Sequence, residues 1–532
     1  MTQDTANAAT INSQETHKPL ILVTGVTGYV GGRLVPRLLE AGYRVRVMSR
    51  DTRYLQGRSW VDQVEIMQGD VLEPQTLPTV MAGVDAAYYL IHSLEGSGSF
   101  EERDLQAARH FSQAAEGAHI KRIIYLGGLG EARDDLSEHL ESRQRVGKVL
   151  RAYAKSVTEF RAVIVVGAGS ISFEMVRYLT ERVPVMITPR WVNTRIQPIA
   201  IEDVLTYLIA ALKTAESAGQ VIEIGGADVL TYGEMMLGYA KERKLKRVMI
   251  PVPVLSPRLS SYWVHLITPI NARTVYPLIE GLKNEVIVTD DNAHKIFPDI
   301  HPLSYIGAVR QALAQLSAQQ VETSWTDSTA AVWETEEPYT YVEERGMMIE
   351  QRKRDSDAPP EKLYQAFTSL GGETGWLYMN WLWRLRGWMD RAMGGVGYRQ
   401  RRGSALRVGD VLDFWRVEAI EPNKMIRLRA EMKLPGRGWL QFEVAPSENG
   451  KSTLTQTAYY APKGLFGLVY WYSIFFIHRL LFDGMIDRVV ALAENDVPTQ
   501  KQVRLALPIR ALVVGIITPI VALGLITRVK RK

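Results

Sequence analysis

The residues best suited to chemistry are three glycines near the N-terminus, at the first, fourth and seventh positions of Gly25-Val26-Thr27-Gly28-Tyr29-Val30-Gly31. They follow an apolar run, Leu20–Thr24, and precede a helical pattern, Gly32–Glu40. In such a loop the first glycine permits a tight turn, the second lets the backbone approach a pyrophosphate, and the third lets the helix pack on the sheet. A helix N-terminus also attracts phosphate. The pattern predicts that a dinucleotide binds to Thr24, Gly25, Thr27, Gly28, Tyr29, Val30 and Gly31.

The residues after the second apolar run, Val45–Met48, bear on which dinucleotide binds. NAD sites usually place an acid there for the ribose hydroxyls, and NADP sites place an arginine for the 2′-phosphate. Arg50 comes first and Arg53 lies one turn further on. A guanidinium grips phosphate through two hydrogen bonds. We therefore favour NADP, while Asp51 keeps NAD open.

The elements that must position this loop alternate between strands and helices. We expect strands at Leu20–Thr24, Val45–Met48, Val64–Met67, Ala86–Ile91, Arg122–Leu126 and Arg161–Val166. Intervening segments are long enough for helices, so residues 19–318 predict an α/β domain with a doubly wound parallel sheet. Residues 319–340 are polar and are expected to be a linker.

The residues from 341 to 495 predict a second, α+β unit. It begins with a strand, followed by a helix at Pro360–Ser369. Strands are then expected at Val411–Ala419, Met425–Met432, Trp439–Val444 and Ser452–Tyr460, and a long helix begins at Leu465.

The glycine loop, together with Gly69-Asp70-Val71, resembles the short-chain dehydrogenase/reductase superfamily. The resemblance is strongest to its atypical and extended members, including the subgroup of the nucleotide-binding accessory subunit of respiratory complex I. It covers roughly Pro19 to Ala318. It implies that Asp70 and Val71 lie beside the adenine and that Leu90, His92 and Ser93 line the nicotinamide ribose. Gly127 then closes the fifth strand, where the family usually has its catalytic serine.

The chain departs from this family at the catalytic signature Tyr-x-x-x-Lys. The best-placed lysine is Lys148, and Gln144 stands where the tyrosine should be. Glutamine cannot donate a proton at a useful pKa, so the usual mechanism has no acid there. His92 and His139 are candidate substitutes, because histidine titrates near neutral pH. Lys148 could still bind the ribose. Packing and surface roles for these three residues remain open.

The second unit resembles the helix-grip fold of START-like proteins, which hold a hydrophobic ligand between the sheet and the last helix. The whole chain looks like bacterial two-part proteins in which an atypical reductase domain precedes a domain of uncharacterised function. Five tryptophans alternate here with arginines, and the residues from 345 to 437 hold 18 Lys and Arg against 11 Asp and Glu, an excess of seven. Such a pattern fits a membrane surface better than nucleic acid, and a tryptophan-rich core is the alternative. Gly464–Ile477 is uncharged for 14 residues, which fits a buried or interfacial helix.

Composition and the ends of the chain narrow the remaining classes. The chain has 532 residues and no cysteine, which excludes disulfide scaffolds, iron–sulfur proteins and cysteine nucleophiles. No His, Asp and Glu cluster has metal-ligand spacing, so no metal is expected. Residues 1–18 are polar, and we expect them to be disordered and not to act as a signal peptide. Ala511–Thr527 is uncharged between basic flanks, and we expect a membrane anchor at residues 508–528. This places the protein on the cytoplasmic face of the cell membrane.

These features together predict a membrane-associated NAD(P)H-dependent oxidoreductase acting on a hydrophobic or lipid-like substrate. Two alternatives stay open, a non-catalytic NADP-binding scaffold or redox sensor and a lipid-binding or transfer protein.

Overall fold

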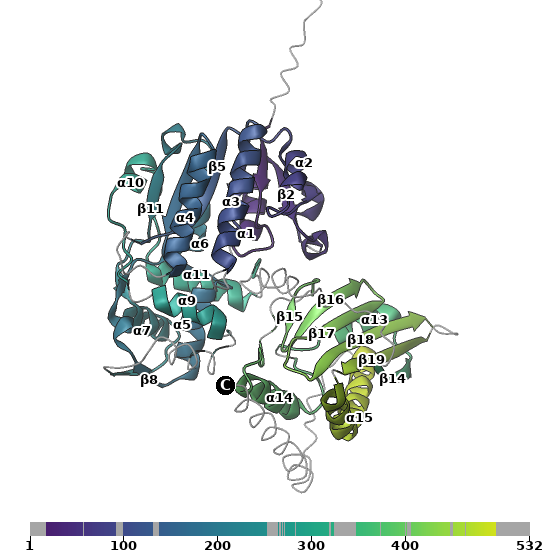
Figure 1. The fold of residues 1–532 in the computed structure, drawn as a ribbon. Coiled ribbons are helices and arrows are strands. Elements are labelled where there is room, and N and C mark those ends of the chain that lie inside the picture. Colours follow the sequence, from purple (N-terminus) through teal and green to yellow (C-terminus); the bar gives the residue numbers. More distant parts are fainter. Residues whose placement is uncertain are drawn as a thin grey trace, which may run out of the picture.

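The computed structural model contains two domains that lie side by side (Figure 1). It describes residues 18–56, 58–91, 99–130, 138–252, 264, 268, 270, 272–281, 284–318, 321–323, 347–372, 374–399, 401, 406–446, 451–462 and 464–495. The first domain is built on a parallel sheet and the second on an antiparallel sheet. The α/β and α+β predictions for the two units are therefore confirmed.

The first domain has a seven-stranded sheet in the order β11-β6-β5-β4-β1-β2-β3. All of its pairings are parallel. The order reverses between β1 and β4, and ligands of doubly wound sheets bind at such a switch point, beyond the carboxyl ends of the strands. The strands are β1 (Leu20–Val23), β2 (Arg44–Ser49), β3 (Glu65–Gln68), β4 (Ala86–Tyr89), β5 (Arg122–Gly128), β6 (Val157–Ala162) and β11 (Val221–Ile224).

Helices cover both faces of this sheet because alternate residues of each strand point to opposite sides. Ile21 and Val23 of β1 pack against α1 (Gly31–Glu40) and α6 (Ile201–Ala210). Leu20 and Leu22 pack on the other face. The helices there are α2 (Leu77–Met81), α3 (Ser99–Gly117) and α4 (Glu138–Tyr153).

The rest of the first domain forms a lobe below the sheet in Figure 1, with its own core. Its helices are α5 (Ile171–Arg182), α7 (Tyr232–Glu242), α9 (Ala272–Gly281) and α11 (Tyr305–Ser317), and α10 (Asn292–Ile296) lies beside the main sheet. Its short strands are β7 (Val165–Val166), β8 (Val185–Thr188), β9 (Arg195–Ile196), β10 (Ile199–Ala200), β12 (Leu230–Thr231) and β13 (Val248–Pro251).

The predicted sixth strand, Arg161–Val166, was wrong in its position. The strand is Val157–Ala162, and Val165–Val166 pairs elsewhere, with β10. This strand was not predicted because its polar residues are typical of a surface segment. Glu159 is in fact fully buried and forms ion pairs with Arg151 and Arg161. The seventh strand, Val221–Ile224, was missed, since four residues before two glycines give little signal.

The second domain is a six-stranded antiparallel sheet with one long helix. The sheet order is β14-β19-β18-β17-β16-β15, and the long helix is α15 (Gly464–Asn495). The strands are β14 (Met348–Ser356), β15 (Val411–Leu412), β16 (Trp415–Glu421), β17 (Met425–Ala430), β18 (Gly436–Pro446) and β19 (Ser452–Pro462), and the shorter helices are α13 (Pro360–Thr368) and α14 (Asn380–Ala392). The predicted order of strand, helix, strands and long helix is confirmed, whereas nothing confirms the START-like assignment.

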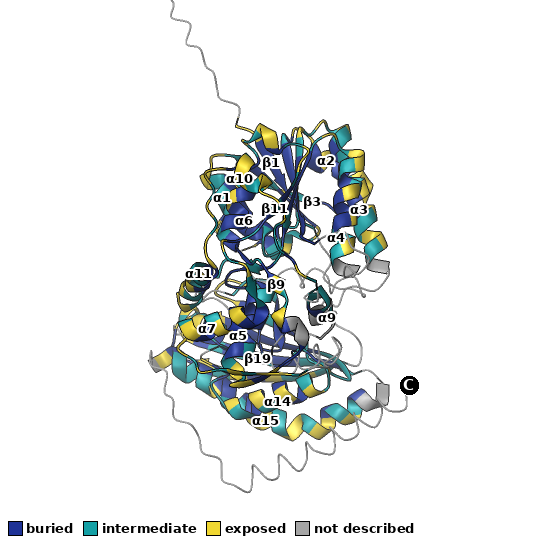
Figure 2. Ribbon diagram, turned by 90° about the vertical axis from the view of Figure 1, so that its left-hand side faces the viewer, coloured by how far each residue is buried: buried dark blue, intermediate teal, exposed yellow. Residues whose placement is uncertain are grey.

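The tryptophans of the second domain contribute mainly to its core. Trp376 is completely buried and stacks on Trp383, with their ring centroids 4.5 Å apart. Trp415 is also buried, whereas Trp388 on α14 is exposed. In Figure 2 the buried sheet of this domain lies above α14 and α15, which carry exposed residues along the lower edge.

Part of the basic excess of this domain is neutralised inside it. Arg399 and Arg416 are buried and both form ion pairs with Glu431, which directly follows β17. Burial raises the pKa of Glu431, but the two guanidiniums outweigh it and hold the pKa at about 2. These two arginines are therefore paired inside the domain and do not form a basic surface.

Three predictions concern parts of the chain outside the described residues: the disordered N-terminus up to residue 17, most of the linker, and the anchor at residues 508–528. Among the helices that the structure does describe, none is both long and apolar enough to cross a bilayer.

Candidate functional site

The glycine loop forms a tight turn between β1 and α1. Gly25 has a φ of +66°, a left-handed conformation that favours glycine. A Cβ atom at Gly25 would lie 2.3 Å from the Leu90 carbonyl oxygen, and one at Gly31 would lie 2.4 Å from the Gly25 carbonyl oxygen. A Cβ atom at either position would therefore collide with the backbone, which agrees with the turn predicted at Gly25 and the close packing predicted at Gly31.

Gly28 differs because its Cβ position is less crowded, with one close neighbour. Within 4 Å of that position, the described residues place only the Gly25 carbonyl oxygen, at 3.1 Å. The loop around it, including Thr27, Tyr29 and Val30, is partly exposed. Val30 is the N-cap of α1 and has no polar side chain to cap the first amides of the helix. In the first turn the Gly32 and Arg33 amides donate to the Gly28 and Val30 carbonyl oxygens, and the Gly31 amide has no hydrogen bond to a described residue. This amide, next to a loop without bulky side chains at Gly28, fits the approach of a pyrophosphate.

Thr24 fixes the loop to the neighbouring strand. Its hydroxyl donates to the Tyr88 carbonyl oxygen at 2.9 Å and accepts from the Leu90 amide at 3.3 Å. Leu90 thereby lies at the carboxyl end of β4, next to Gly25. His92 and Ser93 follow directly in the chain but lie outside the described residues, so their predicted roles stay predictions.

The residues after β2 that bear on the choice between NAD and NADP differ in their exposure and in their contacts. Arg50 is exposed at the end of the strand. Asp51 caps the following turn through the Arg53 amide and also binds the Arg53 guanidinium at 2.9 Å. Burial of Asp51 raises its pKa, but the bonds from Arg53 outweigh that and lower it. The Asp51 carboxylate and the Arg53 guanidinium are thus paired with each other.

Asp70 and Val71 lie just beyond the carboxyl end of β3. The Asp70 carboxylate accepts from the Leu72 amide at 2.9 Å and so shapes the turn. Val71 is buried, and its carbonyl oxygen lies 3.0 Å from His110 Nδ1. Both residues are close to the edge where the resemblance places the adenine.

The usual position of the catalytic tyrosine holds a structural residue. Gln144 is buried and donates from Nε2 to the Gly130 carbonyl oxygen at 2.6 Å. Gly127 is buried at the end of β5, while Lys148 is exposed on α4. His139 lies in the first turn of α4, but its side chain is not described. Gln144 therefore serves the fold, and the described residues place no acid in its stead.

Arg143 is a residue that sequence reasoning missed. Its Nη2 donates to the Leu126 carbonyl oxygen at 2.7 Å, and its side chain packs against Gly128, where a Cβ atom would otherwise lie. A fixed cation thus lies beside the end of β5. A signal was present, since arginine stands next to Gln144 in the sequence, but its partner on the strand was not predictable.

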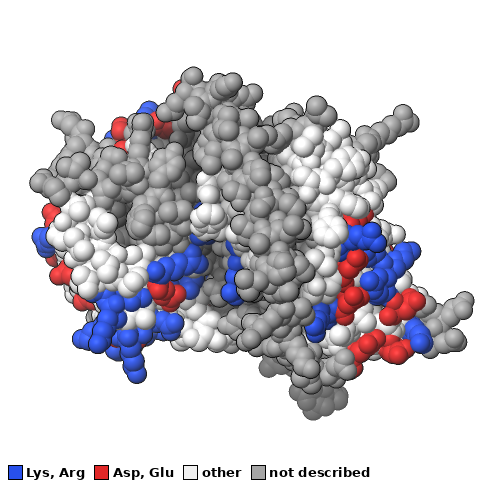
Figure 3. All heavy atoms as spheres, turned by 90° about the horizontal axis from the view of Figure 1, so that it is seen from below, with Lys and Arg blue, Asp and Glu red and all other residues white. Residues whose placement is uncertain are grey.

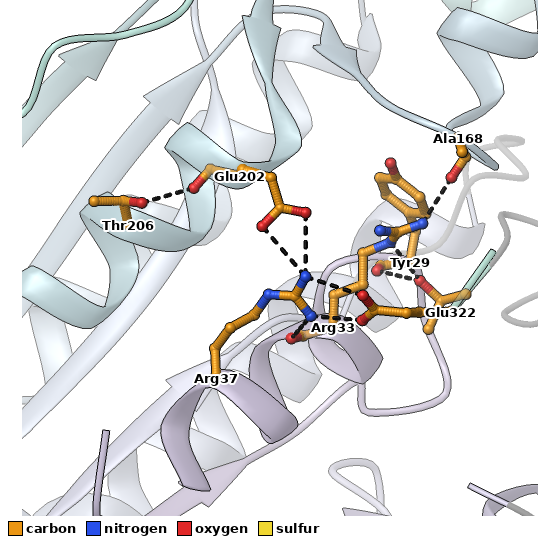
Figure 4. Close-up of polar contacts among 8 residues, drawn as sticks. Tyr29, Arg33, Arg37, Ala168, Glu202, Thr206 and Glu322 are labelled. Atoms are coloured by element: carbon orange, nitrogen blue, oxygen red, sulfur yellow. Dashed lines mark hydrogen bonds and ion pairs between the residues drawn. The ribbon is translucent and has the colours of Figure 1, made fainter. Parts of the chain in front are cut away.

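A second missed feature is the pair Glu322 and Thr323, which binds two arginine side chains of α1 (Figure 4). We call this pair the clasp. Arg33 is fully buried, and it donates from Nε to the Thr323 hydroxyl at 3.0 Å and from Nη2 to the Ala168 carbonyl oxygen at 2.8 Å. Arg37 binds both Glu202 and Glu322. The clasp lies within the stretch predicted as a linker. Together with Ala168 and Glu202, it binds Arg33 and Arg37 of α1, the helix that follows the glycine loop.

The second domain contains an apolar cavity of about 140 Å³ between α14, α15 and the sheet. Cavities of this size accept a benzene-sized group. Buried Trp383 and Trp415 line it, and their Nε1 atoms have no hydrogen-bond partner among the described residues. His478 also lines it, and burial lowers the pKa of His478 to about 3, which keeps it neutral. The wall is therefore uncharged apart from Arg386 at its edge.

Metal binding has no support from the described part of the chain. No three His, Cys, Asp or Glu side chains there are close enough to share an ion.

Comparison with protein families assigns one model to each domain. Residues 25–165 match the NAD(P)H-binding family, which includes the glycine loop, Asp70 and the end of β5. Residues 348–485 match a family described as a protein of unknown function, DUF2867.

Curated relatives align with the first domain. A ceramide reductase of Caulobacter vibrioides is 27% identical over 240 residues, which cover 44% of this chain and 74% of that protein. The chloroplastic divinyl chlorophyllide a 8-vinyl-reductase of Zea mays is 25% identical, and the match covers 44% of this chain and 62% of that protein, less than two thirds of its length.

A similar solved structure is the triphenylmethane reductase of Citrobacter in complex with NADP(H). It is 20% identical, with a TM-score of 0.44, over 55% of this chain and 99% of that chain. The first domain is thus a parallel-sheet domain whose residues 25–165 match an NAD(P)H-binding family, and its sequence is similar to reductases.

Proposed function

We propose that the protein is a membrane-associated, NADPH-dependent oxidoreductase that acts on a hydrophobic, lipid-like substrate. The observation that carries the proposal is the glycine loop, whose tight turn at Gly25 and side-chain-free Gly28 at the start of α1 offer a cradle for the cofactor diphosphate. When bound there, the nicotinamide supplies the hydride. The relatives with reductase names support this reading of the first domain.

NADPH is favoured over NADH by the pairing of Asp51. An NAD site needs a free carboxylate for the ribose hydroxyls. Here the Asp51 carboxylate is bound to the amide and guanidinium of Arg53, while exposed Arg50 stands at the end of β2. Arg50 is therefore the residue proposed to meet the 2′-phosphate.

The absence of an acid at Gln144 favours a conjugated substrate. Reduction of an isolated carbonyl places charge on one oxygen, which calls for a proton donor or an oxyanion site. A conjugated acceptor spreads that charge over several atoms and depends less on a positioned acid. Arg143, fixed beside the end of β5, would stabilise such a charge. His92 and His139 remain candidate acids.

The apolar part of the proposal is supported by the cavity of the second domain. Its wall is rich in aromatic rings, and two of its tryptophans, Trp383 and Trp415, have buried indole N–H groups without a hydrogen-bond partner among the described residues. Buried unpaired donors cost free energy, so a ligand with a hydrogen-bond acceptor would gain affinity there. We propose a START-like role for this domain, in which it holds the apolar substrate or product.

Two other functions remain as alternatives with their own observations. A cofactor-binding scaffold or redox sensor is favoured by buried Gln144, which replaces the catalytic tyrosine. A lipid-binding or transfer protein is favoured by the cavity.

The test is consumption of NADPH by the purified full chain supplied with a membrane lipid extract. The proposal expects oxidation of NADPH that requires the extract and disappears in Gly28→Val. Tight NADPH binding with no oxidation in any lipid fraction would contradict the reductase proposal and favour the scaffold.

A further inference from the structure

Helix α15 is apolar on both of its faces over its first half. Its inner face lines the cavity with Trp471, Ile474 and Leu481. Its outer face carries Val469, Tyr472, Phe476 and Leu480, which are 58%, 67%, 73% and 39% exposed. A surface helix normally turns polar residues outward, and a helix that is hydrophobic all round is buried in protein or lipid. This outer face therefore requires a covering.

Helix α14 extends this surface, because α14 and α15 run along the same lower edge of the second domain in Figures 1 and 2. Trp388 of α14 is 63% exposed. In Figure 3, which views the molecule from below, uncharged side chains gather on the right, where α15 lies in Figure 1. We call the exposed residues Trp388, Val469, Tyr472, Phe476 and Leu480 the aromatic edge.

We propose that the aromatic edge docks on a lipid bilayer surface, with α15 lying flat in the interface. Aromatic rings settle at the headgroup level, and amphipathic helices bury their apolar face at the boundary with the acyl chains. The charges nearby agree with this partner. Arg479 is the only charged residue from 464 to 482, and it is exposed. It would meet lipid phosphate, whereas Arg384 on α14 interacts with Tyr398.

The acidic residues of α15 do not oppose this docking. The first two acids, Asp483 and Asp487, form ion pairs with Arg352 and Arg354 of β14. They are thus directed toward the sheet, away from an anionic lipid surface.

The sequence beyond α15 favours lipid over a second copy of the chain. The uncharged run Ala511–Thr527 begins 16 residues after Asn495. Sixteen residues span at most roughly 55 Å when fully extended. If that run enters the bilayer, it keeps α15 close to the membrane. The helix, about 10 Å across, would then be all that separates lipid from the cavity.

This inference rests on the membrane association within the proposed function and not on reductase activity. The chain has no cysteine, so a single introduced cysteine can carry a fluorescent label without background. We would label Phe476→Cys with an environment-sensitive dye. The matched control is Ile349→Cys on β14, since Ile349 is an apolar residue of the same domain that is 53% exposed.

The full chain is reconstituted into phosphatidylcholine vesicles with phosphatidylglycerol as the minor lipid. We expect nitroxide lipids to quench the label at 476 several-fold more than at 349, and aqueous iodide to quench it less. Equal iodide quenching at both positions on vesicle-bound protein would overturn the docking surface while leaving membrane association intact.

Two further outcomes would also overturn the proposal. Protection from iodide that grows with protein density in the vesicles would identify a second copy as the occupant. Protection from both quenchers at every density would mean that another part of the chain covers the edge.

Discussion

At the scale of single residues, the candidate cofactor site depends on which groups can contact a ligand and which already bind another part of the chain. Gly28 places no side chain in the way of a phosphate. The Asp51 carboxylate accepts a hydrogen bond from Arg53, and the Gln144 amide donates to a backbone carbonyl oxygen. The glycines were predictable because a turn at a helix N-terminus has a local signature. Gln144 was suspected from its spacing, but only the fold shows that it is buried.

Arg50 should decide the preference between NADPH and NADH. A charge-assisted bond to phosphate contributes about 1.5–3 kcal/mol, or roughly 10- to 150-fold in affinity. Arg50→Ala should weaken NADPH binding by that factor and leave NADH binding nearly unchanged. Titrations of both cofactors measure the ratio. Arg44→Ala is the matched control, because Arg44 lies on the same strand and is paired with Glu65 on the surface. An equal loss for both cofactors would contradict this role.

Asp413 in the second domain should make stability depend on pH. Burial raises its pKa to about 7, against the effect of the bond from Trp376. An acid whose pKa is raised on folding favours the folded state at low pH, and this contribution is lost as pH rises toward 7. Asp413→Asn should therefore gain stability relative to the parent chain as pH rises from about 4 to 7, by up to about 1.4 kcal/mol per unit.

Asparagine suits this position because Asp413 has a φ of +55°, which asparagine tolerates. Thermal unfolding of both proteins across this pH range gives the difference, in which the contributions of other groups cancel. A constant difference would show that Asp413 titrates normally.

At the scale of elements, the clasp joins α1 to a segment that the sequence assigned to a linker. Arg33 and Thr323 are 290 residues apart, so no local pattern could pair them. The same limit applies to β6, whose buried Glu159 looks like a surface residue until Arg151 and Arg161 are placed beside it. Apolar runs, by contrast, located five of the seven parallel strands within a residue or two.

Thr323→Val should destabilise the first domain. The valine keeps the shape but removes the hydroxyl, which leaves Arg33 Nε buried without its acceptor, at a cost of about 1–3 kcal/mol. For domains of this size each kcal/mol lowers the melting temperature by about 2–4 °C. Thr206→Ala is the control, since the Thr206 hydroxyl bonds its own helix at an exposed site in the same network (Figure 4). Equal, small shifts in both variants would argue against the clasp.

Filling the cavity of the second domain should abolish binding of an apolar ligand without changing cofactor binding. Ile474→Trp places a larger side chain in the wall between α15 and the sheet. We expect loss of an apolar fluorescent ligand from the protein, with NADPH affinity unchanged. Leu492→Trp, on the same helix and outside the cavity wall, should keep the ligand. Retained ligand binding in Ile474→Trp would remove the cavity from the account.

At the scale of the whole molecule, the chain combines a domain that matches an NAD(P)H-binding family with an α+β domain that contains an apolar cavity. The sequence predicted both units and their order, because each has its own pattern of strands and helices. It did not predict that the arginines of the second unit pair inside it, nor that α14 is a helix with one exposed tryptophan. The pairing depends on contacts between separate segments of the chain, such as Arg399 with Glu431, which lie 32 residues apart.

The central claim is that the glycine loop binds the dinucleotide, and a direct titration of the full chain with NADPH tests it. The account predicts saturable binding that Gly28→Val reduces by at least about tenfold, which corresponds to 1.4 kcal/mol. Gly117→Ala, at a helix end where a Cβ meets nothing within 4 Å, should bind as the parent does. Saturable binding that is unchanged in Gly28→Val would contradict the account.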